Sequence, residues 1–255
     1  AGKSTAIRLM LGLVKAESGT IELFGKPITE ITMQDRQKIG VSLAESGFNG
    51  QFTIAEVKKI LAKMYPEFDE TWFMRECREL RLPEGKQLKE FSNGMKAKLR
   101  VLTALSHKAQ LLILDEPTAG LDAKERIRFR NVISSLAADK IVILATHIVT
   151  DIAYVAKTVV LMNGGKIIKT GTQEELCSDI SGKVWEITAE SDKVMEYMSR
   201  MRVSNAVSDG SKYTLRIVSD NLPEQGAKTV QPTLEDVCIY YFGDMDYEGI
   251  GIYEN

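Results

Sequence analysis

Short apolar runs separated by amphipathic stretches organise this sequence. The wholly apolar runs 111–114 (LLIL) and 141–145 (IVILA) predict two strands that are buried on both faces, and the amphipathic stretch 123–139 between them predicts a helix. Because strands of this kind joined by a helix are typical of a buried parallel sheet, the pattern indicates an α/β fold.

Further segments with helical or strand periodicity precede these two apolar runs. A helical pattern at 54–80 is interrupted by Pro66 and ended by Pro83, and a helix at 93–107 follows, with Ser92 or Asn93 suited to cap its N-terminus. The other predicted elements are a helix at 6–14, a short strand and turn at 19–28 and a strand at 37–43.

The last third of the chain has a different character. Residues 158–171 predict a hairpin that turns at Asn163, Gly164 and Gly165, and beyond about residue 180 mixed strand and helix patterns predict a small α+β appendage. Thr233 is suited to cap a helix near the C-terminus, and the acidic, glycine-containing residues 243–255 are expected to be loosely held.

Composition narrows the class of protein. The chain has 255 residues, with 33 Lys and Arg against 35 Asp and Glu, and its net charge of -2 and lack of a basic block argue against nucleic acid as a partner. Its three cysteines form no C-x-x-C pair, which favours a reducing compartment over a disulfide framework or a zinc site. The apolar runs fall short of the roughly 20 residues of a membrane span.

Two carboxylates at the end of a predicted strand suggest metal and base chemistry. Asp115 and Glu116 follow LLIL, at the edge where ligands bind in open α/β sheets. Asp115 is suited to hold Mg²⁺, largely through water, and Glu116 to deprotonate an attacking water. The alternative is a pair of acids placed favourably at the start of a helix.

The opening pentapeptide AGKST has its own candidate chemistry. Gly2, Lys3, Ser4 and Thr5 match the end of a phosphate-binding loop, in which backbone N–H groups receive phosphate, the lysine reaches the β and γ phosphates and the serine ligates Mg²⁺. The alternative is a helix that happens to begin with small residues.

Three further motifs carry a family resemblance. FSNGMKAKL at 91–99, LLILDEPTAGLD at 111–122 and ILATH at 143–147 stand in the order of the signature motif, Walker B, D-loop and switch histidine of ABC ATPases. Residues 1 to about 171 therefore resemble an ABC transporter ATP-binding subunit. The FSxGM form and QPTLEDVCIYYFG near the C-terminus resemble bacterial ABC-2 type exporter subunits.

The resemblance implies a P-loop NTPase fold of the α/β class. An ABC ATPase core would occupy residues 1–180, with a helical subdomain at about 48–107, and a small α+β accessory region would occupy 181–255. It also implies that a strand and four loop residues precede Ala1, so that the chain as given lacks an N-terminal segment and binds nucleotide poorly.

The resemblance also assigns roles to residues. Gly2, Lys3, Ser4 and Thr5 would bind phosphates, with Ser4 and Asp115 on Mg²⁺. Glu116 would be the general base and His147 the sensor of the γ phosphate, although a histidine after a strand is more often a polar end-cap. Ser92, Asn93 and Gly94 would cap the γ phosphate of ATP on the other protomer, and they also suit a simple helix cap. Asp122 would touch the partner subunit.

Some positions depart from the family pattern. Phe91, Asn93 and Met95 replace the usual Leu, Gly and Gln of the signature. The Q-loop glutamine falls at Ala44, and neither Glu45 nor Gln51 is in register to replace it. We expect the signature to function through its backbone N–H groups, and we expect the Q-loop change to affect the metal contact and coupling to the membrane partner.

The function implied is MgATP hydrolysis that drives dimerisation, as a homodimer or with a paired ABC ATPase, and powers transport, by expectation export, through separate membrane-spanning permease subunits. The protein would lie in the cytoplasm, peripheral to the inner face of the cell membrane, without nucleic acid. One alternative is a non-transport ABC ATPase of the DNA-repair or ribosome-associated kind. The other is a regulatory module that binds ATP with little turnover.

Overall fold

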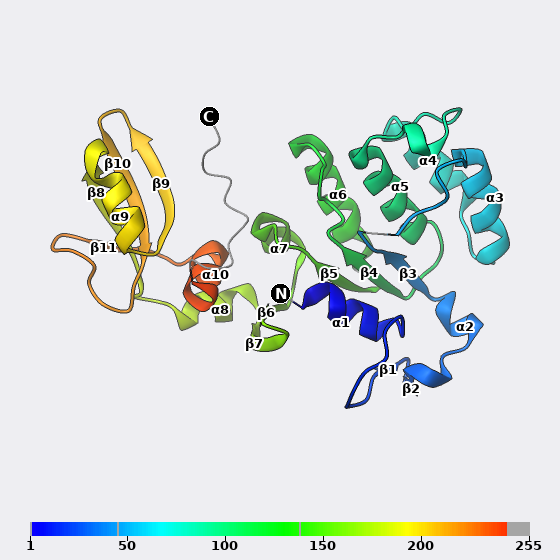
Figure 1. Ribbon diagram of the computed structural model, residues 1–255, viewed down its shortest axis with the longest axis horizontal. Helices are drawn as coiled ribbons and strands as arrows, with labels where there is room; N and C mark the ends of the chain where they lie inside the picture. Colours follow the sequence, from blue (N-terminus) through cyan, green and yellow to red (C-terminus); the bar gives the residue numbers. More distant parts are fainter. Residues whose placement is uncertain (1, 45, 138, 244–255) are drawn as a thin grey trace. The chain divides into compact units, whose positions relative to one another are not determined.

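The computed structural model describes residues 2–44, 46–137 and 139–243, and the chain forms two compact units. The first unit comprises Lys3–His147, and the second comprises Ile148–Asn255 together with Ala1–Gly2 (Figure 1). The acidic C-terminal stretch, for which a loose structure is predicted, lies outside the described residues apart from Gly243.

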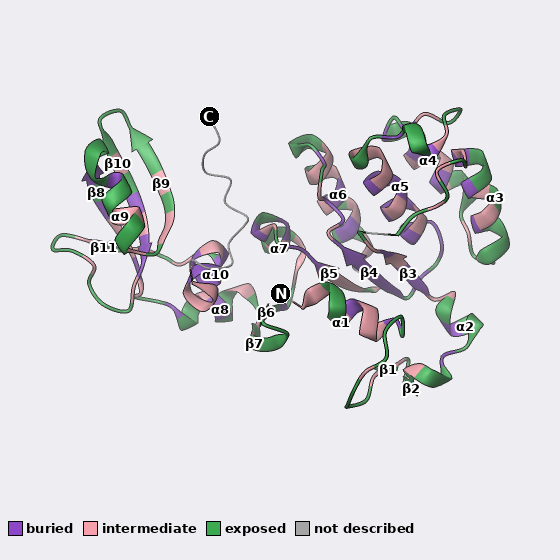
Figure 2. Cartoon of the chain, in the orientation of Figure 1, coloured by how far each residue is buried: buried purple, intermediate pink, exposed green. Residues whose placement is uncertain are grey.

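A parallel three-stranded sheet lies at the centre of the first unit. Its order is β3 (Ile39–Ser42), β4 (Leu111–Asp115) and β5 (Ile141–Ala145), which confirms the predicted parallel arrangement. Figure 2 shows β4 buried along its whole length. It is paired on both sides, and α1 (Lys3–Met10) and α5 (Asn93–Leu105) pack on it. The prediction of burial on both faces fails for β5, which lies at the edge of the described sheet and leaves Ile141 68% exposed.

Helix α1 (Lys3–Met10) packs its apolar side against this sheet. It ends earlier than the predicted stretch 6–14 because Gly12 takes φ +67°, and the N–H groups of Gly12 and Leu13 bond back to carbonyls of the last turn. The exposed Leu13 and Val14 therefore follow the helix. A core of buried side chains holds α1 on the sheet: Ile7, Leu11, Ile39, Leu111, Ile113 and Ala145.

The predicted helical insert is confirmed as two helices with side-chain caps. Thr53 caps α3 (Ile54–Met64) and Asp69 caps α4 (Glu70–Glu79), on either side of the break at Pro66. The remaining elements of this unit are β1 (Glu22–Leu23), β2 (Lys26–Pro27), α2 (Met33–Arg36), α5 (Asn93–Leu105), α6 (Ala123–Leu136) and short 3-10 turns at Ile28–Glu30 and Leu88–Glu90.

Helix α5 lies directly on β3. A Cβ at Gly40 of β3 would come within 2.2 Å of the carbonyl oxygen of Ala104, so only glycine permits this approach. β3 and the helix that begins in the FSNGM motif are thereby packed closely together.

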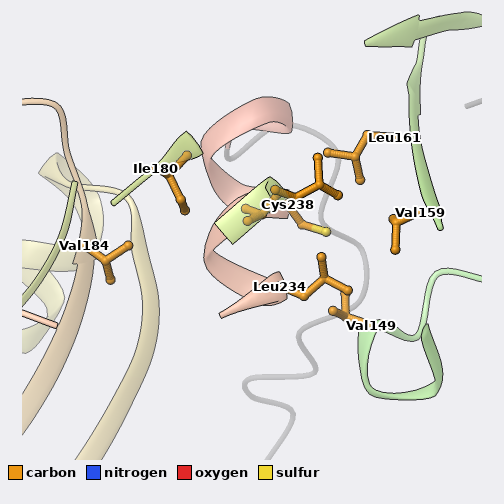
Figure 3. Close-up of a cluster of buried hydrophobic side chains, with 9 residues drawn as sticks. Val149, Val159, Leu161, Ile180, Val184, Leu234 and Cys238 are labelled. Carbon is orange, nitrogen blue, oxygen red and sulfur yellow. The ribbon is translucent and has the colours of Figure 1, made fainter. Parts of the chain in front are cut away.

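The second unit contains the predicted hairpin and the helix predicted near the C-terminus. Strands β6 (Val159–Asn163) and β7 (Lys166–Gly171) are antiparallel, and side chains from the hairpin pack in one core with α7 (Val149–Val155), α8 (Gln173–Asp179) and α10 (Leu234–Phe242). Figure 3 shows this core, which contains Val149, Val159, Leu161, Leu176, Ile180, Val184, Leu234, Val237 and Cys238.

An antiparallel sheet with a helix on it forms the rest of this unit, in keeping with the α+β character predicted for the appendage. Its strand order is β11-β8-β10-β9. Val194 of α9 (Val194–Arg200) packs in one core with Ile187 and Leu215 of the sheet. The strands are β8 (Val184–Glu190), β9 (Val203–Asp209), β10 (Lys212–Val218) and β11 (Lys228–Thr229), with a 3-10 turn at Ser191–Lys193. Residues 148–180 thus share a unit with the accessory residues, and the sequence-based boundary at 180 stays a prediction.

No helix among the described residues combines the length and apolar character that crossing a membrane requires.

A buried carboxylate ties α10 to the antiparallel sheet. Asp236 is fully buried and accepts hydrogen bonds from Arg216 Nε at 2.9 Å, Arg216 Nη2 at 2.8 Å and Ser204 Oγ at 2.5 Å. Thr233, which caps α10 as predicted, donates its N–H and hydroxyl to the same carboxylate. Burial alone would raise the pKa of Asp236, but these hydrogen bonds outweigh it and lower the pKa.

We predict that Asp236→Asn destabilises the second unit by about 3 to 5 kcal/mol, because it leaves Arg216 without its buried counter-charge. The folded pKa is lowered, so the stabilisation is present above about pH 4 and the cost of the substitution shrinks as the pH falls below it. Urea unfolding followed by Trp185 fluorescence, in a Trp72→Phe background, measures the change. The exposed Asp192→Asn is the control, and equal midpoints for the two variants would contradict the prediction.

Candidate functional site

The carboxyl end of β4 delivers two acidic residues to one edge of the sheet. Asp115 is the last residue of the strand, is 6% exposed and pairs in register with Ala145 of β5. Glu116 follows with φ +47°, a left-handed conformation that is strained for a residue with a side chain. The sharp turn is held by a hydrogen bond from the Glu116 N–H to the Ala145 carbonyl, at 2.8 Å.

Helix α1 brings Ser4 to this edge. The Ser4 hydroxyl donates a hydrogen bond of 3.3 Å to Oδ1 of Asp115, across 111 positions of sequence. The two oxygen atoms that the sequence assigns to Mg²⁺ are therefore neighbours.

This pair fits a magnesium ion. A hydroxyl and one carboxylate at a helix N-terminus suit Mg²⁺, which takes few protein ligands and completes its shell with water and phosphate oxygens. Across residues 2–44, 46–137 and 139–243, no three His, Cys, Asp or Glu side chains gather into a metal-holding group, so the donor set does not resemble a closed structural metal site.

Two residues after β5 contact the Glu116 carboxylate. His147 Nδ1 lies 2.9 Å from Oε1, and the Thr146 hydroxyl donates to Oε2 at 3.2 Å. His147 is exposed, with 56% of its side chain accessible, whereas Thr146 is buried. The candidate base and the candidate sensor are thus in contact, and Thr146 is a third member that the motif comparison did not single out.

The remaining residues of AGKST surround the start of α1. Gly2 precedes the helix with φ +108°, and Lys3, the first helical residue, is half-buried. Ser4 and Thr5 are exposed. Backbone N–H groups of the first turn of a helix have no partner within the helix, so this end is suited to receive an anion.

The FSNGM segment caps α5 and lies against the segment AGLD. Ser92, not Asn93, is the cap: its hydroxyl accepts the Met95 N–H at 3.2 Å. A Cβ at Gly94 would stand 3.0 Å from the carbonyl oxygen of Gly120, so the two segments touch through their backbones. Ser92 and Asn93 are exposed and Gly94 is half-buried.

Asp122 has a similar structural role at the next helix. It is exposed and accepts the Glu125 N–H at 2.8 Å, which caps α6. Glu125 in turn forms an ion pair with Lys98 of α5, a buried lysine that the sequence interpretation did not include. Lys98 lies within FSNGMKAKL, but its pairing with Glu125 depends on how α5 and α6 pack, which the motif does not reveal.

The segment that replaces the Q-loop borders a groove. Ala44 is exposed, Glu45 lies outside the described residues, and Gln51 accepts a hydrogen bond from Lys89 at 3.5 Å. This groove has a volume of about 320 Å³. Its described lining includes the three basic residues Lys89, Lys96 and Arg100 and no acidic residue. Its complete described lining is Ser46, Gly47, Phe48, Gly50, Leu88, Lys89, Lys96, Leu99 and Arg100.

The second histidine serves the core. His107 is 3% exposed, stacks on Tyr65 with ring centroids 4.0 Å apart, and places Nε2 3.3 Å from the Ile39 carbonyl oxygen. Burial lowers its pKa, which favours a neutral ring. Its surroundings differ from those of the exposed His147.

Comparison with known proteins identifies a matching family and several relatives. Residues 1–119 fit the family model described as ABC transporter. The linearmycin resistance ATP-binding protein LnrL of Bacillus subtilis is 32% identical over 71% of this chain and 60% of its own length. The bacitracin transport ATP-binding protein BcrA of Bacillus licheniformis is 35% identical over 66% and 56%. The Nod factor export ATP-binding protein I of Rhizobium etli is 28% identical over 95% and 82%.

A solved structure has a similar fold. An ATP-binding subunit of an ABC transporter superposes with a TM-score of 0.63 over 70% of this chain and 77% of its own, at 24% identity. This likeness confirms the α/β, P-loop NTPase fold. The chain spans 60% of the length of LnrL and 56% of BcrA. Its motifs, fold and relatives together place the chain in the ABC transporter family, among its ATP-binding subunits.

Proposed function

We propose that this protein binds and hydrolyses MgATP and thereby powers a transporter. The observation that carries the proposal is the contact of Glu116 with His147 at the sheet edge where Ser4 meets Asp115. One edge thus brings together the candidate base, the candidate phosphate sensor and the two candidate magnesium ligands. Phosphoryl transfer to water needs little covalent chemistry from a protein, so these positioned groups are sufficient.

We assign a role to each residue from its position at this edge of the sheet. The N-terminus of α1 and Lys3 receive the phosphates, with Gly2 and Thr5 alongside, and Ser4 and Asp115 hold the metal. When bound, Mg²⁺ neutralises charge on the phosphates. Glu116 accepts the proton of the attacking water, while His147, held by that carboxylate, reaches the γ phosphate. A regulatory module without turnover would not need a base placed in this way.

A second ATPase completes each site. Ser92 and Asn93 and the capping residue Asp122 are exposed, and Gly94 links the two loops through Gly120. The N-terminus of α5, capped by the neutral Ser92, is suited to the γ phosphate of ATP held by another copy, and Asp122 is placed to touch that copy. We therefore propose a homodimer, or a pair with a related ATPase, with ATP at the interface.

The groove beside residues 46–50 is the proposed docking site for the membrane-spanning subunit. Its lining combines the apolar side chains of Phe48, Leu88 and Leu99 with basic side chains. A cytoplasmic helix of the partner with an apolar anchor and acidic neighbours would complement it. The protein would then lie on the inner face of the cell membrane, and the relative named for Nod factor export favours export as the direction.

We expect Glu116→Gln to bind ATP with nearly unchanged affinity but to lower kcat at least about 100-fold, because the amide cannot accept the proton of water. Steady-state phosphate release and binding of a fluorescent ATP analogue are measured on the same preparation. The exposed Glu17→Gln is the control. Equal inactivity of the unmodified protein and Glu116→Gln, with ATP bound to both, would contradict the enzymatic proposal.

Ser92→Asp tests the composite site. Aspartate caps a helix as well as serine does, so thermal stability should be retained, but its charge would repel the arriving γ phosphate. We expect ATP-dependent dimerisation in a Glu116→Gln background to weaken at least about ten-fold, a loss of roughly 1.4 kcal/mol, measured by analytical ultracentrifugation. The exposed Ser181→Asp should dimerise normally. Unchanged dimerisation of Ser92→Asp would exclude this role.

Arg100→Glu tests the groove. We expect the substitution to release the protein from membranes that contain its permease, since it reverses a charge in the lining while leaving ATP binding intact. The measurement is the membrane-bound fraction after sedimentation at increasing salt. Arg75→Glu, on the exposed side of α4, is the matched control, and equal retention of both variants would argue for docking elsewhere.

A further inference from the structure

We infer that Thr146 is a positioning residue for Glu116, a role that rests on the proposed function of Glu116 as the base. The inference names a hydroxyl that orients the carboxylate, and it assigns Thr146 no bond-making step.

Three consecutive residues, at the end of β5 and directly after it, contact Glu116. Ala145 accepts its backbone N–H at 2.8 Å, Thr146 donates to Oε2 at 3.2 Å, and His147 contacts Oε1 at 2.9 Å. Glu116 is therefore fixed at its backbone and at both carboxylate oxygens by one short segment. The strained φ of +47° needs such support to persist.

The Thr146 hydroxyl gives Glu116 a hydrogen bond that stays in place during the reaction, which His147 cannot do. His147 is exposed and has to interact with the γ phosphate in the proposed reaction, so its hold on Oε1 has to be free to change. Thr146 is only 6% exposed, so its hydroxyl stays beneath the carboxylate. A carboxylate only accepts hydrogen bonds, and the Thr146 hydroxyl is therefore the donor. Its bond to Oε2 fixes the plane of the carboxylate while Oε1 exchanges partners.

A base in one orientation reacts faster than one that rotates, because the proton of water is then within reach in every encounter. This role predicts a loss in kcat without a loss in ATP affinity, since the phosphate ligands at Lys3 and Ser4 are untouched. A merely structural role predicts a loss of thermal stability that leaves kcat of the folded protein unchanged.

The test compares Thr146→Val, which keeps the shape but lacks the hydroxyl, with Thr146→Ser, which keeps the hydroxyl. We expect Thr146→Val to lower kcat about ten-fold with KM for ATP within about two-fold, the effect of losing one hydrogen bond to a charged group. Thr146→Ser should retain at least about half of kcat. Thr103→Val removes a hydroxyl that bonds the Arg100 carbonyl in α5, away from the site, and is the matched control.

ATP binding and thermal melting of each variant show that it is folded, and Thr146→Ala replaces Thr146→Val if the latter does not fold. Normal kcat in Thr146→Val, or equal loss in Thr146→Val and Thr146→Ser, would overturn the inference. If the unmodified protein binds ATP and does not hydrolyse it, the proposed function itself fails. Active unmodified protein with unimpaired Thr146→Val refutes only the role of Thr146.

Discussion

The parallel pairing of β4 between β3 and β5 is the constraint on which the candidate site depends. Pairing Asp115 with Ala145 in register places residues 115–116 beside residues 145–147, although some 30 positions separate them in sequence. The contacts of Glu116 with Ala145, Thr146 and His147 follow from that register. β4 lies between two strands and is buried throughout. The acidic residues at its carboxyl end are therefore its candidate functional part.

Helix termini form a second system, built on the same sheet. The FSNGM segment begins α5 and AGLD precedes α6, and the two meet at Gly94 and Gly120. The buried ion pair of Lys98 with Glu125 joins these helices behind their exposed ends. The surface proposed to meet a second copy can thus be rigid, because the packing of α5 against α6 holds its loops in place.

Much of the fold followed from local patterns. The apolar runs at 111–114 and 141–145, the caps at Ser92 and Thr233 and the hairpin at 158–171 have short-range causes, so the sequence predicted them. The early end of α1, the exposure of β5 and the Lys98 pair depend on conformation or on distant partners, which periodicity does not reveal. Motifs identified Glu116 and His147 as candidates, but the contact of Thr146 with Oε2 required the register of β4 and β5.

The register also limits how the chain can vary in length. Side chains of a strand alternate between its faces, so a single residue inserted or deleted within β5 would shift its pairing with β4 and turn the following side chains to the opposite face. Ala145, Thr146 and His147 would then no longer meet Glu116 in their present order. β5 is therefore expected to tolerate substitutions far better than changes in length.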